Sequence, residues 1–348
     1  MKAIQIPATG DLRVVTLPEP QPAAGEVKLR LHYVGFCGSD LNTFLGRNAM
    51  AKAEVIPGHE IGATIEALGE GCPHTLHVGQ TVTVNPYTAC GLCAACRNGR
   101  PNACQHNETL GVQRDGAMRE FFCVPWQKVI PVEGITVRDA ALIEPMSVGF
   151  HAVSRGMVTD TDTVVVFGCG MVGLGAVIRS VQRGAVVIAV DLSTEKLQLA
   201  REAGATYTIN SAEEDLQERV LAYTGGLGAD VVIEAVGSPA TYVSAIDVVS
   251  FTGRVVCIGY AKSDVSFQTK YFVQKELDIR GSRNALPADF RAAVRAIQHG
   301  TLPMDRFVSA VVTPDEALAA MQRWAAAPAQ VFRILVKFYV FLVLLKKD

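Results

Sequence analysis

The sequence lacks the features that mark nucleic-acid-binding, membrane or secreted proteins. It has no block of basic residues, and 32 lysines and arginines nearly balance 34 acidic residues, for a formal net charge of −2. Its N-terminus has no apolar run of the kind found in signal peptides. It also has no internal repeat and no low-complexity linker. These absences predict a cytoplasmic protein whose partner is a small molecule, with no nucleic acid and no membrane.

A strongly apolar stretch, ILVKFYVFLVLLKKD, ends the sequence. Lys337 interrupts it, and it is shorter than the ~20 residues that a membrane-spanning helix requires. Residues 331–337 are predicted to form a closing strand. The segment after Phe338 has three interpretations that the sequence leaves open: an extra strand, a subunit contact or a non-native extension.

With 348 residues, 49% of them apolar, the chain is long enough for two domains with separate cores. The first part consists of short alternating runs broken by glycine and proline, such as EVKLRLHYVGF and QTVTVNPY, which indicate a β domain. Apolar strands then alternate with helices, which indicates a parallel sheet covered on both faces. We therefore predict an α/β protein with a β domain over 1–150, completed by 288–348, and a second domain over 151–287.

Gly168, Gly170 and Gly173 form a G-x-G-x-x-G motif directly after the apolar strand TVVVF and at the head of a predicted helix. Such a turn lets the backbone approach a pyrophosphate at the helix N-terminus. The next strand ends on Asp191, 18 residues after the last glycine, where a carboxylate can accept hydrogen bonds from an adenosine ribose. This strand–helix–strand context predicts a dinucleotide site.

The cofactor predicted for this site is NAD rather than NADP. The carboxylate of Asp191 would repel a 2′-phosphate, and the next residues, Leu192 and Ser193, supply no arginine to bind one. Val172 in the glycine turn and Lys196 near the adenosine ribose are further predicted cofactor contacts.

Four of the nine cysteines are clustered, with the spacing Cys90-x2-Cys93-x2-Cys96-x7-Cys104. Four thiolates this close in sequence are typical of a closed, tetrahedral zinc site that stabilises a loop. In a cytoplasmic enzyme such a cluster indicates a metal rather than disulfides. The sequence therefore predicts a structural zinc.

A second group of candidate ligands is dispersed along the first domain. It consists of Cys37 in GFCGSD, His59 and Glu60 in GHE, and Glu144 in LIEPM. A catalytic zinc takes three protein ligands and keeps one exchangeable position. Taken singly, each residue also fits an ordinary role as a core thiol, a core histidine, a surface acid or a helix-start carboxylate.

Together these motifs resemble the zinc-containing medium-chain alcohol and polyol dehydrogenases over nearly the whole chain. The segments that carry the resemblance are CGSD, GHE, the four-cysteine loop, EP (144–145) and GCGMVG (168–173). Within that family the chain is most similar to the sorbitol, threonine and sugar-acid 5-dehydrogenase branch, and GVQRDGAMREFF and GSRNALPADF (281–290) resemble the aldonate/uronate-type enzymes in particular. The resemblance implies a GroES-like β catalytic domain followed by a Rossmann domain, two zinc ions per chain, NAD, and a homo-oligomer that is a dimer or a tetramer.

The resemblance also assigns roles at the catalytic zinc. It implies that Cys37, His59 and Glu60 are zinc ligands, with the chain bent at GHE so that both adjacent side chains face one ion. Glu144 stands where other alcohol dehydrogenases have a cysteine ligand. It would either bind the zinc-bound water or exchange with that water as a ligand.

Ser39 corresponds to the proton-relay hydroxyl of the family. Relatives commonly have a histidine three residues after that hydroxyl, whereas this chain has Asn42, which cannot act as the terminal base. Ser39 could pass its proton to the cofactor ribose and then to water, or Glu144 could carry more of the proton traffic. The terminal proton acceptor therefore stays open.

These parts predict an enzyme of carbohydrate metabolism that transfers hydride between NAD and a secondary hydroxyl of a polyol or sugar acid. Arg283 and Asn284 stand where polyol dehydrogenases contact their substrates, and Arg283 could pair with a carboxylate or touch the cofactor. One alternative is an L-threonine 3-dehydrogenase-like enzyme, which has the same ligand set. Another is a non-catalytic dinucleotide-binding protein with structural zinc. The sequence does not identify the substrate.

Overall fold

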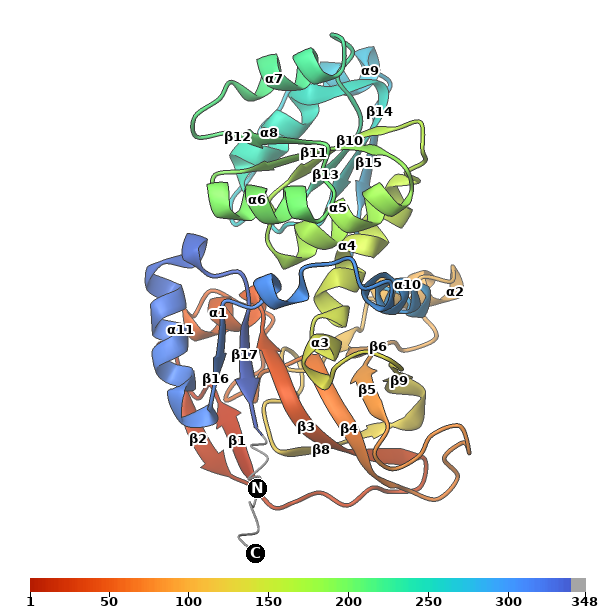
Figure 1. The fold of residues 1–348 in the computed structure, drawn as a ribbon, viewed down its shortest axis with the longest axis vertical. Coiled ribbons are helices and arrows are strands. Elements are labelled where there is room, and N and C mark those ends of the chain that lie inside the picture. The colour runs from red at the N-terminus through yellow and green to blue at the C-terminus, as the bar shows by residue number, and fades with distance from the viewer. Residues whose placement is uncertain (339–348) are drawn as a thin grey trace, which may run out of the picture. The chain divides into compact units, whose positions relative to one another are not determined.

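The computed structural model describes residues 1–338 and divides the chain into two compact units (Figure 1). Unit 1 comprises Met1–Asn98, Cys104–Glu144 and the described residues from Val308 on, and unit 2 comprises Gly99–Ala103 and Pro145–Phe307. No helix among the described residues is long and apolar enough to cross a membrane. The apolar segment that follows Phe338 lies outside the described residues.

Unit 1 is built around a seven-stranded sheet, as the alternating pattern of the first domain predicted. Its strand order is β16-β17-β3-β4-β5-β9, and β8 also pairs with β3. The strands are β3 (Glu26–Phe36), β4 (Glu60–Leu68), β5 (Thr81–Val84), β8 (Phe121–Pro125), β9 (Val129–Pro131), β16 (Ala310–Val312) and β17 (Ile334–Lys337). Two small sheets pair β1 (Lys2–Gln5) with β2 (Arg13–Thr16) and β6 (Tyr87–Thr88) with β7 (Glu108–Thr109).

The C-terminal segment completes this unit. The predicted closing strand forms as β17, which pairs antiparallel with β3 and parallel with β16. Leu29, Ile61 and Val336 from three of these strands meet in the apolar core of the unit. The helices of unit 1 are α1 (Gly38–Phe44), α2 (Ala94–Arg97), α3 (Val137–Ala140) and α11 (Ala317–Ala326).

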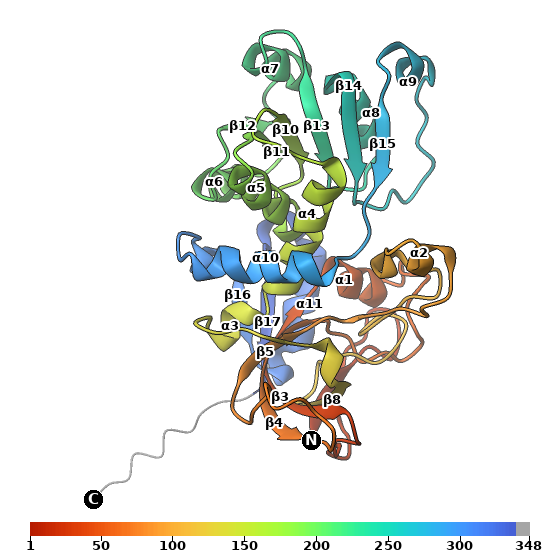
Figure 2. The same cartoon turned by 90° about the vertical axis from the view of Figure 1, so that its right-hand side faces the viewer.

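Unit 2 is a doubly wound α/β unit. All neighbouring strands of its six-stranded sheet are parallel, in the order β12-β11-β10-β13-β14-β15, and helices lie on both faces (Figure 2). The strands are β10 (Thr163–Phe167), β11 (Val186–Asp191), β12 (Tyr207–Asn210), β13 (Ala229–Glu234), β14 (Val249–Cys257) and β15 (Asp278–Gly281). The chain order changes direction at β10, which is the switch point where such sheets bind ligands.

The helices of unit 2 alternate with its strands, as the sequence pattern predicted. They are α4 (Ile143–Gly156), whose first two residues belong to unit 1, α5 (Met171–Gln182), α6 (Thr194–Glu202), α7 (Leu216–Tyr223), α8 (Pro239–Val248), α9 (Lys270–Gln274) and α10 (Pro287–Gln298). The strands are buried because helices cover both faces of the sheet. Val164, Val165 and Val166 of β10 are fully buried.

The unit boundaries differ from those predicted at residues 150 and 287. The structure divides the chain after Glu144 and after Phe307, so α10 belongs to unit 2 rather than completing unit 1. The physical reason is a buried contact, since Nδ1 of His151 on α4 lies 2.9 Å from Oδ2 of Asp289 on α10. Only the chain from Val308 on returns to unit 1.

Candidate active site

The four predicted structural ligands lie together around α2. The sulfur atoms of Cys90, Cys93, Cys96 and Cys104 are all within 4.8 Å of one another, and none is in a disulfide. Cys93 Sγ lies 3.5 Å from Cys96 Sγ and 3.8 Å from Cys104 Sγ. Sulfurs bound to a tetrahedral zinc at ~2.3 Å are about 3.8 Å apart, so this arrangement fits that ion.

Backbone amides in this loop favour the thiolate, which is the form of cysteine that binds metals. The N–H groups of Cys96 and Gln105 donate to Cys93 Sγ and lower the pKa of the Cys93 thiol to about 6. His106 N–H donates to Cys104 Sγ at 3.3 Å. These amides therefore favour the thiolate of Cys93, whereas burial and the side chain of Cys93 raise the pKa of Cys96 to about 12.

Cys37, His59 and Glu60 also come together, although Cys37 is distant from GHE in the sequence. Each offers one ligand atom, and the three atoms lie within 4.8 Å of one another. His59 Nδ1 and both carboxylate oxygens of Glu60 are buried without a hydrogen-bond partner among the described residues. Buried polar atoms are rarely left unpaired, so this cluster fits a metal ion.

The turn at Gly58 explains how two adjacent side chains reach one point. Gly58 has a φ of +104°, a conformation that side chains with a Cβ rarely adopt. A Cβ at this position would also crowd Val34 and Met118. The chain bends here before Glu60 begins β4, and both His59 and Glu60 are buried. The backbone therefore turns at Gly58, directly before the two adjacent side chains.

Arg333 is a charged neighbour of this cluster that the sequence analysis did not find. Its Nη1 lies 2.9 Å from Glu60 Oε1, although the angles are not those of a hydrogen bond, and it donates to the Phe36 carbonyl at 2.6 Å. Burial opposes the charge of Arg333, but Glu60 and Cys37 raise its pKa. No local motif marks Arg333, because it precedes β17 and meets Glu60 only through strand pairing with β3.

Glu144 is close to this cluster but is not one of the three groups whose ligand atoms converge. It is buried in the first turn of α4 and accepts a hydrogen bond from the Tyr87 hydroxyl on β6. Burial raises the pKa of Glu144 to about 7, against the opposing charge of His59. Burial and Glu144 likewise raise the pKa of Tyr87. Tyr87 was missed because a tyrosine before the cysteine loop carries no sequence signal of its own.

Helix α1 carries the predicted relay hydroxyl. Ser39 Oγ is buried and has no hydrogen-bond partner among the described residues, so it is available to a substrate. The neighbouring Asp40 is buried, and its Oδ2 accepts from the Cys37 N–H at 2.8 Å. Burial raises the pKa of Asp40 to about 6, and His59 opposes that rise. Asp40 lies inside the CGSD motif, three residues after the predicted ligand Cys37, so the sequence could have indicated that it is part of the site.

The glycine turn has the geometry that a dinucleotide site needs. Gly168 follows β10 with a φ of +86°, and Gly170 is the residue that precedes α5. A Cβ on Gly173 would overlap the carbonyl oxygen of Gly168, so the helix can pack this closely only with glycine. Val172 lies in the first turn of α5, whose N-terminal N–H groups favour an anion.

Asp191 ends β11 and is bound to the glycine turn. Its Oδ2 accepts from the Cys169 N–H at 2.7 Å, and its Oδ1 accepts from the Ser193 N–H at 3.0 Å. Ser193 caps α6, which carries Lys196 in its first turn. The carboxylate is therefore held in one orientation, and it also fixes the backbone of the turn.

The two predicted substrate residues follow β15. Asn284 has a φ of +54°, and its side-chain amide donates to the Asn102 carbonyl at 2.9 Å. The Arg283 carbonyl accepts from Asn102 Nδ2 at 2.7 Å. Asn284 therefore uses its amide group in a contact within unit 2, whereas the side chain of Arg283 lines a pocket described below.

Both halves of the chain match known families. Residues 23–134 match the alcohol dehydrogenase GroES-like domain, and residues 172–299 match the zinc-binding dehydrogenase domain. A sorbitol dehydrogenase of Halalkalibacterium halodurans is 36% identical over 82% of this chain and 84% of its own. An L-galactonate-5-dehydrogenase of Escherichia coli K12 is 33% identical over 83% of this chain and 85% of its own.

The fold agrees with a solved structure of the same kind. An alcohol dehydrogenase of Escherichia coli CFT073, solved with NADH, has a TM-score of 0.88 and 29% identity over 97% of this chain and 99% of its own. The chain belongs to the zinc-dependent medium-chain alcohol dehydrogenase family, with a GroES-like and a Rossmann domain. It is therefore an oxidoreductase that acts on CH–OH groups, and the resemblance and the fold class predicted from the sequence are confirmed.

Proposed function

We propose that this enzyme transfers hydride between NAD and a secondary hydroxyl of a polyol or sugar acid, with zinc at Cys37, His59 and Glu60. The observation that carries the proposal is the convergence of these three ligand atoms within 4.8 Å, with His59 Nδ1 and Glu60 Oε2 buried and without a hydrogen-bond partner among the described residues. The relatives that act on sorbitol and L-galactonate support the substrate class.

When bound, zinc lowers the pKa of an alcohol and stabilises negative charge on its oxygen, while NAD accepts hydride. Other residues of the protein position and compensate the charged groups that would surround that ion. Arg333 compensates one oxygen of Glu60, and Asp40 fixes the backbone at Cys37. Tyr87 holds the buried Glu144 by a hydrogen bond, and Glu144 would act beside the three converging groups rather than as one of them.

The alcohol proton leaves through Ser39, whose hydroxyl is buried and unpaired. Asn42 follows three residues later and has no titratable group, so the chain ends the relay differently from relatives with a histidine there. The cofactor ribose followed by water, or Glu144, supplies the next acceptor. The choice between them decides the pH dependence of turnover.

A substrate panel tests the proposed function. NAD reduction is measured with sorbitol, erythritol, L-galactonate and L-threonine, on protein whose zinc content is known. We expect turnover with a polyol or sugar acid and none with L-threonine. Threonine as the best substrate would favour the threonine 3-dehydrogenase alternative. Folded protein with both zincs and no turnover on any of the four would favour a non-catalytic role.

Asp191→Ala is expected to weaken NAD binding and to relax discrimination against NADP. The reason is the loss of charge-assisted hydrogen bonds, by roughly 1–3 kcal/mol, together with the loss of repulsion towards a 2′-phosphate. Asp191→Asn is the matched control, because it keeps an oxygen for the Cys169 N–H but removes the charge. We expect it to relax discrimination with less loss of NAD affinity. Steady-state kinetics checks this, and a wild-type preference for NADP would refute it.

We also propose a cytoplasmic homo-oligomer, a dimer or a tetramer. None of the nine cysteines, all of which lie within residues 1–338, is in a disulfide, as is usual in a reducing compartment.

Exposed apolar side chains at one sheet edge support the oligomer. Strand β15 is an edge of the sheet in unit 2 and exposes Ile279 at 44%, while Val273 on α9 is 84% exposed. Light scattering after gel filtration checks the oligomer, and a monomer at micromolar concentration would refute it.

A further inference from the structure

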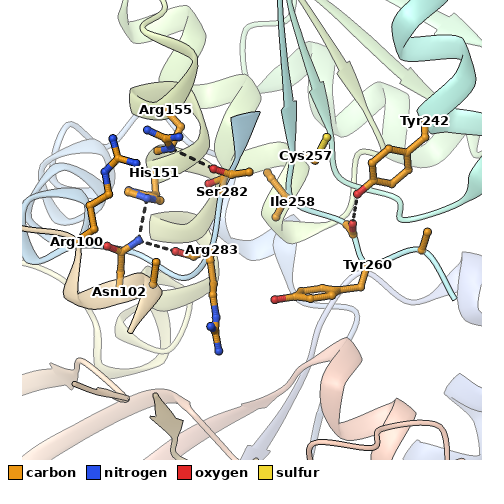
Figure 3. A pocket seen from close by; sticks show the side chains of 14 residues that line it. Arg100, Asn102, His151, Arg155, Tyr242, Cys257, Ile258, Tyr260, Ser282 and Arg283 are labelled. Atoms are coloured by element: carbon orange, nitrogen blue, oxygen red, sulfur yellow. Dashed lines mark hydrogen bonds between the residues drawn. The ribbon is translucent and has the colours of Figure 1, made fainter. Parts of the chain in front are cut away.

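Unit 2 contains a pocket that none of the proposed zinc ligands and none of the glycine-turn residues line (Figure 3). It has a volume of about 430 Å³ and lies where β14 ends at Cys257 and β15 ends at Gly281. Helix α4 and the segment Gly99–Ala103 contribute the other walls, and every lining residue belongs to unit 2. Its size is that of a small-molecule site.

Two arginines make one side of this pocket strongly positive. The guanidinium ends of Arg100 and Arg155 point toward one another in Figure 3. Burial and then the charges of Arg100 and Arg280 lower the pKa of Arg155. Arg280 pairs with Asp278 at 2.9 Å, whereas Arg100 and Arg155 form no ion pair within residues 1–338, although Arg155 Nε donates to the Gly281 carbonyl at 3.1 Å. No aspartate or glutamate lines the pocket, so this positive charge is left without an anion.

Two buried polar atoms in the same pocket also lack partners. Ser282 is 8% exposed and Asn102 is 4% exposed, yet Ser282 Oγ and Asn102 Oδ1 have no hydrogen-bond partner among the described residues. Buried polar atoms are nearly always paired, so such atoms in a pocket point to a ligand or bound water. A hydroxylated ligand can both donate and accept, and so can satisfy both atoms.

The orientation of the Asn102 amide follows from its neighbours. The Arg283 carbonyl can only accept a hydrogen bond, so the Asn102 side-chain atom that lies 2.7 Å from it is the amide nitrogen, Nδ2. The same Nδ2 lies 3.0 Å from Nε2 of His151, whose Nδ1 lies 2.9 Å from Asp289 Oδ2. The side-chain oxygen of Asn102, Oδ1, is thereby left as an acceptor without a hydrogen-bond partner among the described residues.

We propose that this pocket binds the oxyanion, a carboxylate or phosphate, of a small hydroxylated molecule. Arg100 and Arg155 bind the oxyanion through their forked N–H groups, and Ser282 Oγ and Asn102 Oδ1 bind its hydroxyls. A pocket of this volume with buried polar atoms in its wall favours a small molecule over an acidic side chain of another protein. Two sources share this chemistry, the carboxylate of a sugar-acid substrate and free phosphate, and they can be separated experimentally.

Binding is measured by calorimetry on the zinc-loaded protein without turnover, so the binding result does not depend on the proposed function, whereas the KM comparison that assigns the source of the anion does. The probes are inorganic phosphate, L-galactonate and neutral sorbitol, each with and without saturating NADH. Arg100→Gln and Arg155→Gln remove one guanidinium each, and Ser282→Ala removes the unpaired hydroxyl. Arg183→Gln, at the exposed end of α5, is the matched control for lost charge.

We expect phosphate or L-galactonate to bind at least about tenfold more tightly than sorbitol, and each pocket arginine variant to lose about tenfold or more in that affinity. Arg183→Gln should change it less than about twofold. A raised KM for L-galactonate alone in Arg155→Gln assigns the pocket to the substrate carboxylate, and unchanged KM values with weakened phosphate binding assign it to a free anion. Both outcomes support the proposal.

Three results would overturn it. The first is that neither anion binds the wild-type protein. The second is that the pocket arginine variants bind the anions as the Arg183→Gln control does. The third is that saturating NADH abolishes anion binding and the same variants weaken NADH, because the arginines would then serve the cofactor's own phosphates.

Discussion

His59→Ala is expected to lower turnover by at least about 1000-fold and to leave one zinc per chain. An open catalytic site has only three protein ligands, so losing one releases the ion or leaves it exchangeable. The ion contributes several kcal/mol to stabilising charge on the reacting oxygen, and each ~1.4 kcal/mol is a factor of ten in rate. Zinc analysis after dialysis, beside NAD reduction, measures both effects.

The matched control is His32→Ala, which removes another buried histidine of unit 1. His32 contacts Thr64 at 2.9 Å across β3 and β4 and belongs to neither cluster of candidate ligands. We expect this variant to keep both zincs and most of its turnover, even if it is less stable. A His59→Ala enzyme with both zincs and wild-type turnover would show that the catalytic ion is held elsewhere.

Cys93→Ser is expected to lose the other zinc and to lower the melting temperature by roughly 10 °C. A structural zinc contributes folding free energy directly, so losing it costs several kcal/mol. Cys93 Sγ contacts the sulfur atoms of both Cys96 and Cys104. Molecules that stay folded should keep part of their turnover, because this cluster is closed to substrate.

Cys123→Ser on β8 is the control for this experiment. Cys123 is a partly buried thiol outside the cluster, and burial raises its pKa. We expect it to keep both zincs and to melt within a few degrees of the wild-type protein. The structural assignment would be wrong if Cys93→Ser abolished turnover but melted normally and kept both ions.

The parts of the site that the sequence predicted are those encoded by short motifs. The four cysteines and the glycine turn lie within single loops, where spacing alone brings the groups together. GHE was predictable because Gly58 supplies the bend and the two ligand types are adjacent. The spacing between Cys37 and GHE does not predict that they lie together. That prediction came from the family resemblance.

The parts that the sequence did not predict depend on tertiary contacts between distant residues. Tyr87 meets Glu144 across 57 residues, and Asn284 meets Asn102 across 182. Arg333 reaches Glu60 only because β17 and β4 both pair with β3. None of these pairs has a periodic or motif signal. Helix α10 belongs to unit 2, whereas the sequence pattern predicted it in the first domain. The contact that holds it there, between buried His151 and Asp289, also joins residues far apart in the sequence.

The paired acids around the catalytic site give the most direct test. Glu60 lies with Cys37 and His59, whereas Glu144 is bound by Tyr87 and stands outside that group. Zinc per chain, measured by atomic spectroscopy after dialysis of Glu60→Ala and Glu144→Ala, separates a ligand from a residue that holds water. We predict about one zinc in Glu60→Ala and about two in Glu144→Ala, which should turn over more slowly. A Glu60→Ala enzyme with two firmly bound zincs and wild-type turnover would contradict the assignment of both GHE side chains to one metal.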